Sequence, residues 1–356
     1  MQSAAPKPMN DAVTSWLMVV YGLIAVMVVI GGVTRLTQSG LSMVTWHPIA
    51  GTVPPISEAD WQAEFDRYKA FPQYAAMFAN MTIEQFKGIF FWEYVHRLFG
   101  RVIGLAFFVP WLFFVIRKKI TGRWIGWTGL AFILGGLQGV LGWYMVKSGL
   151  VDKPAISHFR LAAHLCLAFF VANYILVLIL RRRTTHGAGR EQLRLRNWAL
   201  GLLAVLVVQV VYGAFMAGTR AGYMYQTWPL MNGVFFPENA LLGPSFWDNL
   251  VNNVDMIQFI HRSLGWVALV LGIGVAIAAL RSNRSSHQRT TGWLLAGLMT
   301  VQFGLGVSVI LVDGIPPWMG ASHQLCAFFL VSTCVALIYS CGRRERPTHT
   351  EHYSAA

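Results

Sequence analysis

Charged side chains are scarce in this chain of 356 residues: Asp, Glu, Lys and Arg make up 12% of it, against 55% hydrophobic residues. A soluble domain usually carries about a quarter charged residues, so the composition excludes one. The sequence instead contains apolar runs long enough for the ~20 residues that a transmembrane helix needs. We place eight, near residues 14–35, 89–116, 124–146, 159–180, 197–218, 256–280, 292–312 and 318–341.

Cysteine is scarce too, and its positions exclude two kinds of site. The four cysteines are Cys166, Cys326, Cys334 and Cys341, all within the fourth and eighth apolar runs. Because none lies in the segments between runs, we expect no disulfide framework. The sequence Cys-x-x-Cys-His does not occur, which excludes covalent attachment of a c-type haem.

Acidic residues number 15 against 28 Lys and Arg, and the basic ones gather after the second, fourth, sixth and eighth runs. Basic segments of membrane proteins face the cytoplasm, so we expect both termini there. The net charge of +13 is then mainly a signal of topology, with some affinity for anionic lipid and no nucleic-acid partner. No cleavable signal or transit peptide is visible before the first run, which favours the bacterial inner membrane.

The two halves of the chain repeat each other around a His-Arg dipeptide. Glu93-Tyr94-Val95-His96-Arg97 aligns with Gln258-Phe259-Ile260-His261-Arg262, and a second histidine follows in each half, at His164 and His323. Further matches are Thr34-Arg35 with Thr219-Arg220, Thr45-Trp46 with Thr227-Trp228, and Gln138 with Gln302. Each half has an even number of spans, so the copies run in the same sense. We therefore expect an all-α polytopic membrane protein of eight transmembrane helices, as two pseudo-twofold-related four-helix bundles in residues 1–183 and 184–356.

The four repeated histidines are candidate iron ligands. All lie near the outer starts of their helices, hence at similar depth, where an imidazole in lipid is a functional hypothesis by default. Two facing histidines suit a six-coordinate haem, one between His96 and His164 and another between His261 and His323. A carboxylate-bridged iron centre would need more than one Glu-x-x-His pair, and zinc would need its ligands in one site. Haem fits better than either.

A carboxylate accompanies only the first histidine pair. Glu93 lies one helical turn before His96, and Gln258 takes its place in the second half. Near a haem edge, Glu93 is suited to proton transfer or to stabilising a developing cation. The alternative is an interfacial acid paired with an arginine.

Four arginines on the outer side are candidate contacts for the haem propionates: Arg35, Arg97, Arg220 and Arg262. For Arg97 and Arg262 the alternative is snorkelling to lipid headgroups. Two histidines, His47 and His158, have no counterpart in the other half. The long outer loop at residues 36–88 contains an amphipathic segment, Ser57 to Tyr74, which suits a helix on the outer membrane surface. The loop is either a substrate lid or a surface cover.

Several motifs together resemble those of haem A synthase, in the branch found in alphaproteobacteria and mitochondria. They are Gly31-Gly32-Val33-Thr34-Arg35-Leu36-Thr37-Gln38-Ser39-Gly40-Leu41-Ser42, Trp46-His47-Pro48, Gly51-Thr52-Val53-Pro54-Pro55 and Glu93-Tyr94-Val95-His96-Arg97. The resemblance implies an oxidoreductase that oxidises a ring methyl group of haem O to a formyl group. The product, haem A, serves cytochrome c oxidase assembly. It also implies substrate haem between His96 and His164, haem b between His261 and His323, and a catalytic role for Glu93. The farnesyltransferase that makes haem O is the partner it implies.

Two other functions stay open on the residues alone. One is a diheme b-type cytochrome acting only in electron transfer, which would not need the Glu93 and Gln258 difference. The other is a transporter, which usually has charges at the bilayer midplane. The sequence leaves open the electron acceptor, the source of the formyl oxygen, the role of the second haem, and whether the protein is a homo-oligomer. Some bacterial relatives carry a cysteine pair in the outer loops, and this chain has none there.

Overall fold

The computed structural model describes residues 11–45, 50–149, 155–183, 190–282 and 286–341, and most of them are helical. Eight of these helices are long and apolar enough to cross a membrane. They are α1 (Ala12–Leu36), α4 (Ile83–Ile116), α5 (Arg123–Gly149), α6 (His158–Arg183), α7 (Arg190–Thr219), α9 (Val254–Leu280), α10 (Ser286–Leu311) and α11 (Pro317–Cys341). Each contains one of the apolar runs, so the prediction of an all-α, multi-pass membrane protein is confirmed.

Helix α4 begins earlier than its apolar run, at Ile83. Thr82 and Gln85 form a capping box: the Gln85 amide donates to Thr82 Oγ1 at 3.3 Å, and the Thr82 amide donates to Gln85 Oε1 at 3.0 Å. Such a box satisfies two backbone donors that a helix start leaves without partners. The first turns of α4 are polar, and hydrophobicity alone therefore does not reveal them.

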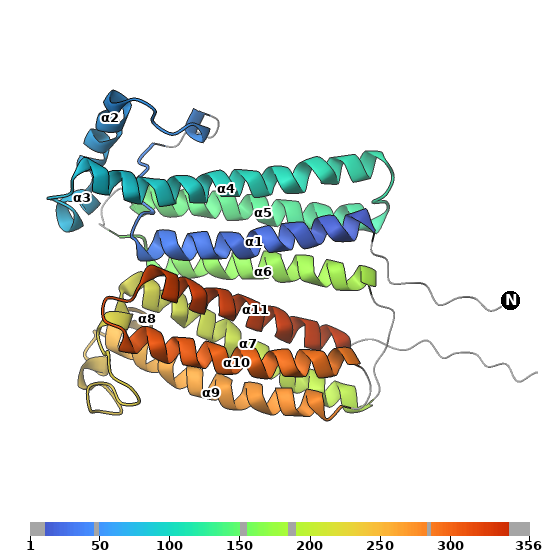
Figure 1. Cartoon of the computed structure of the whole chain (residues 1–356). Coiled ribbons are helices and arrows are strands. Elements are labelled where there is room, and N and C mark those ends of the chain that lie inside the picture. Colours follow the sequence, from blue (N-terminus) through green and yellow to red (C-terminus); the bar gives the residue numbers. More distant parts are fainter. Residues whose placement is uncertain (1–10, 46–49, 150–154, 184–189, 283–285, 342–356) are drawn as a thin grey trace, which may run out of the picture.

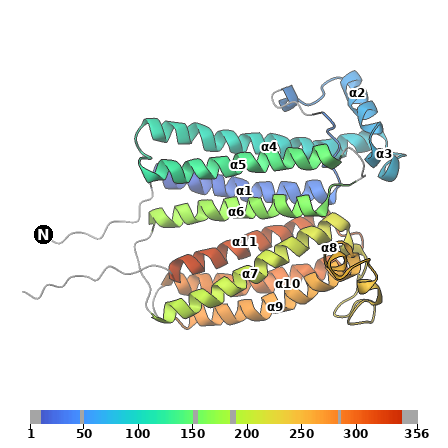
Figure 2. The same cartoon turned by 180° about the vertical axis from the view of Figure 1, so that it is seen from behind.

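The eight long helices form a central group and two edges. Helices α1, α6, α7 and α11 lie at the centre, with α4 and α5 at one edge and α9 and α10 at the other (Figures 1 and 2). Packed pairs recur between the halves: α1 with α4 and α7 with α9, then α5 with α6 and α10 with α11. One hydrophobic core extends through both halves. The pseudo-twofold relation and the division after residue 183 stay predictions.

Short helices cover one end of this bundle, called the loop end below (Figure 1). Between α1 and α4 lie η1 (Ala50–Thr52), α2 (Glu58–Lys69) and α3 (Pro72–Met77), and between α7 and α9 lie η2 (Ala221–Tyr223), η3 (Glu238–Leu241) and α8 (Phe246–Asn252). Helix α2 confirms the helix expected in the amphipathic segment. Its Phe65 and Tyr68 stack on Phe86 of α4, with ring centroids 5.0 and 5.3 Å apart. Protein therefore covers this aromatic face.

The two halves approach most closely where α6 meets α7. A Cβ added to Gly218 would lie 2.4 Å from His158 Cβ and 2.7 Å from His158 Cα. The His158 ring packs edge-on against Phe215, with centroids 5.0 Å apart and an interplanar angle of 89°. The structure thus places His158 in the contact between α6 and α7.

Gly218→Ala is therefore expected to lower the free energy of unfolding by about 1–3 kcal/mol, the usual cost of overpacking. The control is Gly297→Ala in α10, where an added Cβ meets nothing within 4 Å. That change should be neutral or stabilising, because alanine favours a helix by about 0.5–1 kcal/mol over glycine. Thermal unfolding in detergent, followed by circular dichroism, measures both. Equal melting of the two variants would contradict the close contact.

Candidate haem sites

The four repeated histidines are half-buried in α4, α6, α9 and α11. Their Nδ1 atoms are buried and have no hydrogen-bond partner: His96, His164, His261 and His323. A buried polar group without a partner costs about 1–3 kcal/mol. The rings of His261 and His323 lie at an interplanar angle of 71°, with centroids 6.5 Å apart. Two metal–nitrogen bonds of about 2 Å each, with the two ring radii, span roughly 6 Å. The pair therefore fits a porphyrin iron between its rings.

Each of these four rings packs against a glycine of a neighbouring helix. A Cβ added to the glycine would lie 3.0–3.3 Å from the ring Cε1: Gly31 with His96, Gly142 with His164, Gly213 with His261, and Gly306 with His323. A larger residue would press on the ring at that distance. Each ring orientation is thus set by close helix packing.

Glutamines support three of the four histidine positions. Gln138 in α5 donates from Nε2 to the carbonyl oxygen of His164 at 3.0 Å, and Gln209 in α7 does the same to His261 at 3.0 Å. Gln302 Nε2 lies 3.2 Å from His323 Nε2. The sequence repeat pointed to Gln138 and Gln302, whereas Gln209 lacked such a signal.

Glu93 is buried, with 3% of its surface exposed, and both of its carboxylate oxygens are bound. Oε2 accepts hydrogen bonds from Ser42 Oγ and the Met43 amide, each at 2.8 Å, and Oε1 accepts one from Arg97 Nη2 at 2.5 Å. Arg97 also donates to the carbonyl oxygens of Met43 at 2.8 Å and Thr45 at 3.2 Å. Glu93 and Arg97 therefore attach the segment that follows α1 to helix α4. The structure contains the pairing of Glu93 with an arginine that was the alternative to a role in proton transfer.

Gln258 makes the corresponding attachment in the second half. It is fully buried, its Oε1 accepts from the Tyr225 amide at 3.2 Å, and its Nε2 donates to the Tyr225 carbonyl oxygen at 2.9 Å. Arg262 donates to the carbonyl oxygens of Thr227 at 2.9 Å and Pro229 at 3.0 Å. A neutral amide is thus sufficient to attach this loop, so the negative charge of Glu93 is not required for attachment.

The negative charge of Glu93 also acts on α2. Burial raises the pKa of the Tyr68 hydroxyl above its ordinary value, and the charge of Glu93 raises that pKa further. The hydroxyl therefore stays protonated and donates to Gln73 Oε1 at 3.0 Å, while Gln73 Nε2 donates to the Gln38 carbonyl oxygen at 3.1 Å. This chain of contacts holds α2 and α3 over the loop end of α4.

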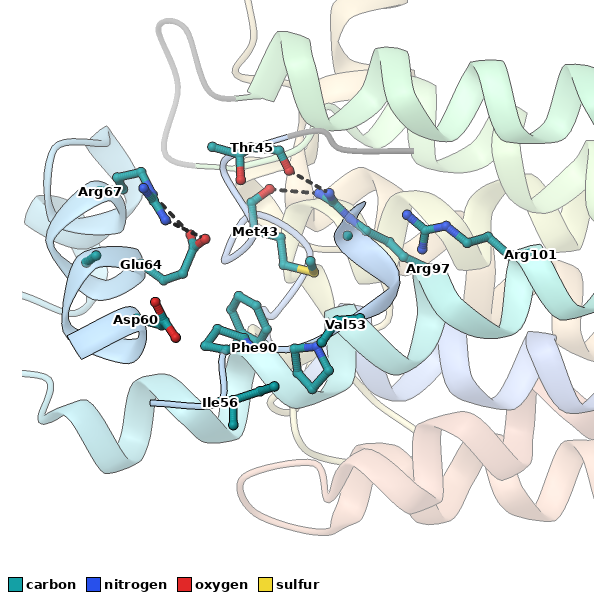
Figure 3. Close-up of a pocket in the computed structure, with 14 residues that line it drawn as sticks. Met43, Thr45, Val53, Ile56, Asp60, Glu64, Arg67, Phe90, Arg97 and Arg101 are labelled. Carbon is teal, nitrogen blue, oxygen red and sulfur yellow. Dashed lines mark hydrogen bonds and ion pairs between the residues drawn. The ribbon is translucent and has the colours of Figure 1, made fainter. Parts of the chain in front are cut away.

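A cavity of about 420 Å³ lies beside the Glu93 and Arg97 pair, between α4 and the first loop (Figure 3). Arg97 and Arg101 line it from α4, and Asp60, Glu64 and Arg67 line it from α2. The first outer loop, predicted to be a lid or a cover, therefore forms one wall of this cavity, called the polar chamber below. Arg97, the partner of Glu93, lines the chamber from α4.

Arg35 reaches across to the second half. Its Nη2 donates to the carbonyl oxygens of Ala217 at 2.7 Å and Gly218 at 3.0 Å, at the last turn of α7. A cation is favourable at a helix C-terminus. Arg220 is exposed, with a left-handed φ of 60°. Two buried donors, Arg35 Nε and Arg262 Nη1, have no partner. Propionate contacts by the four arginines stay predictions.

Sequence reasoning missed an acid in the second half. Asp255, one turn before Gln258 in α9, is 4% exposed, and its Oδ1 has no partner. The Tyr225 hydroxyl bonds to its carboxylate; burial, and then the charge of Asp255, raise the pKa of Tyr225. The signal was an acid in the first turn after a capping Asn253. The two halves therefore differ in where the buried acid lies, three residues before His96 in the first half and six residues before His261 in the second.

The remaining candidate residues are His47, any metal-binding cluster and the four cysteines. His47 lies outside the described residues. Among the residues that are described, no three His, Cys, Asp or Glu side chains gather in a way that could hold a metal ion. The four cysteines are free thiols in α6 and α11.

Eight spanning helices, with a pair of buried histidines in each half, define a polytopic membrane protein suited to porphyrin iron. The model of the cytochrome oxidase assembly protein family matches residues 14–335, and the chain belongs to this family. It is similar to proteins named "Heme A synthase". That of Paramagnetospirillum magneticum is 39% identical over 93% of this chain and 94% of its own length. That of Rhodopseudomonas palustris is 43% identical over 92% and 90%, and that of Nitrosospira multiformis is 43% identical over 90% of each.

Proposed function

We propose that this protein is a haem A synthase, which oxidises a ring methyl group of haem O to a formyl group. Membership of the cytochrome oxidase assembly family and the names of its relatives support this assignment. The observation on the chain itself that carries it is the duplicated histidine pair, with unpartnered buried nitrogens in both halves. A diheme cytochrome shares that feature, but the relatives named above favour the enzyme.

The two pairs would hold different haems. His96 and His164 would bind the substrate haem, and His261 and His323 would bind haem b, which supplies one-electron redox chemistry when bound. Haem b would either relay electrons or stabilise the bundle, and the His261→Gly variant described in the Discussion distinguishes the two roles.

Glu93 would act as the base for the substrate methyl group. Its carboxylate is fixed by Arg97, Ser42 and the Met43 amide, three contacts that orient it while the loop shields it from bulk water. Release of the Arg97 contact would free one oxygen to take up a proton during oxidation of the methyl group. The polar chamber lined by Arg97 and Arg101 offers that proton and water a path to the loop end.

The proposed setting is the bacterial inner membrane, with both termini in the cytoplasm and the loop end outside. The basic segments after α4, α6 and α9 support this orientation. The expected source of substrate is the membrane-bound farnesyltransferase that makes haem O.

The assignment is tested by expressing the full chain in a bacterium that makes haem O and lacks a haem A synthase. Haems extracted from the purified protein and from membranes are separated by reversed-phase chromatography. Haem A in the membranes, with haem b and haem O or haem A on the protein, is the expected result. Two equivalents of haem b, with no haem A anywhere, would overturn the assignment in favour of the diheme cytochrome.

A further inference from the structure

The two edges of the molecule differ in how well their helix pairs are sealed. At the α9 and α10 edge, Trp266 and Phe303 are in contact, with ring centroids 4.6 Å apart. Nearer the middle of the helices, Met299 of α10 presses on Gly272 of α9, where an added Cβ would lie 2.3 Å from the Met299 methyl carbon. Met299 is 3% exposed. Two large side chains of α10 therefore fill this seam.

The positions that match these two side chains in the first half are glycines. Alignment of Gln138 with Gln302, in the repeated Gln-x-x-Leu-Gly segment of α5 and α10, sets Gly139 against Phe303 and Gly135 against Met299. Gly135 and Gly139 are exposed, and a Cβ added to either would meet nothing within 4 Å. The α4 and α5 seam thus lacks the filling that the second half has.

The opposite wall of the first seam is reduced only in the part nearer the loop end, because the counterpart of Gly272 in α4 is the larger Phe107. The counterpart of Trp266 is Arg101, whose side chain lines the loop-end cavity instead (Figure 3). The ring contacts that the described residues make between α4 and α5 lie toward the other end, where Phe107 and Phe108 pack on Phe132 with centroids 5.8 and 5.3 Å apart. Helices α4 and α5 are therefore held together far from the loop end, and the open seam lies between that contact and the histidines.

This open seam begins at a predicted haem ligand. Gly142 touches the His164 ring, since a Cβ added there would lie 3.1 Å from Cε1. Gly139 and Gly135 follow at one and two turns along the same face of α5. The second half has the same arrangement at His323, where Phe303 and Met299 occupy those turns. A haem held at His164 has room beside it that a haem held at His323 lacks.

We propose that the α4 and α5 seam, opened by Gly135 and Gly139, holds the hydrocarbon tail of the substrate haem, and that Phe303 and Met299 exclude such a tail from the second site. This inference rests on the proposed function, because haem O differs from haem b chiefly in carrying a farnesyl-derived tail. The occupant is apolar, and the seam offers it an apolar surface: Phe132, which packs on Phe107 and Phe108 of α4, is 38% exposed. The same residues would sort the two haems between the two halves.

The direct test transfers the second-half residues into the first half, as the double variant Gly135→Met and Gly139→Phe. Protein prepared with a vacant first site is titrated with haem O and with haem b, and binding is followed by the bis-histidine absorption bands. We expect affinity for haem O at this site to fall by at least about tenfold, with affinity for haem b changed much less. The control is Gly136→Thr, which copies Thr300 onto the neighbouring exposed position of α5, where an added Cβ also meets nothing within 4 Å.

The reciprocal variant, Met299→Gly with Phe303→Gly, should let the second site accept haem O. Haem b retained at the second site of the Gly135→Met and Gly139→Phe variant, and haem O bound at the first site of the reciprocal variant, report that the bundle has folded. If the Gly135→Met and Gly139→Phe variant binds haem O as the wild type does, the seam holds only lipid and the inference is wrong. Failure of the proposed function looks different, because the wild type itself would then neither bind haem O nor form haem A.

Discussion

Replacing Glu93 by glutamine is expected to lower haem A formation by about 10²–10⁴-fold, the range that general acid–base catalysis usually contributes. An amide cannot take a proton from water at neutral pH, so the proposed base is lost. The amide keeps one oxygen that can accept from Ser42 and the Met43 amide, so the loop should stay attached there although the ion pair with Arg97 is lost. Both haems should therefore remain bound. Chromatography of extracted haems measures the product, and absorption spectra measure haem content.

A second variant separates catalysis from attachment. Glu93→Leu removes the hydrogen bonds from Ser42, the Met43 amide and Arg97, and leaves the Arg97 charge buried without its acid. Breaking a buried ion pair in this way typically costs about 3–5 kcal/mol. Both variants lose the ion pair, but Glu93→Gln keeps one oxygen that accepts hydrogen bonds from Ser42 and the Met43 amide. We therefore expect faster proteolysis of the first loop in Glu93→Leu than in Glu93→Gln. Normal haem A output from Glu93→Gln would show that Glu93 serves attachment alone.

The membrane spans could be predicted from the sequence because an apolar run of this length can cross the bilayer whichever helices pack against it. The residues at which the helices begin were harder to predict. The beginning of α4 depends on the capping box of Thr82 and Gln85, which lies among polar residues. Pairing of Glu93 with an arginine was the alternative that the sequence left open, and the spacing of Glu93 and Arg97, one helical turn apart, is compatible with it. Its partners Ser42 and Met43 could not be predicted, since the path of the first loop over α4 is a tertiary property.

Contacts between the halves were also beyond the sequence. Arg35 was expected at a propionate, and the structure gives its Nη2 the carbonyl oxygens of Ala217 and Gly218. Nothing local to Arg35 encodes a partner so far along the chain. The repeat, in contrast, did carry information that hydrophobicity alone conceals. The alignment shows that Gly139 takes the place of Phe303. The consequence of this difference follows only from the structure, in which Phe303 packs on Trp266.

Replacement of His261 by glycine is expected to remove haem b from the second half and to leave the first histidine pair able to bind its haem. The two pairs belong to different helices, α9 and α11 for one and α4 and α6 for the other, so loss of one ligand should not reach the other iron directly. Haem content should fall by one equivalent. A matched control is His158→Gln, which changes a membrane-side histidine outside both pairs and should retain both haems.

Added imidazole then decides what the second haem does. The His261→Gly variant has space for it next to Gly213, which lies against the missing ring. If haem b relays electrons, haem A formation should fall by at least about 100-fold in the variant and return when imidazole restores the sixth ligand. If haem b only braces the bundle, the variant should melt at lower temperature but keep its rate per folded molecule. Unchanged haem content and spectrum in His261→Gly would contradict axial ligation by His261 itself, and with it the pairing of His261 and His323 on one iron.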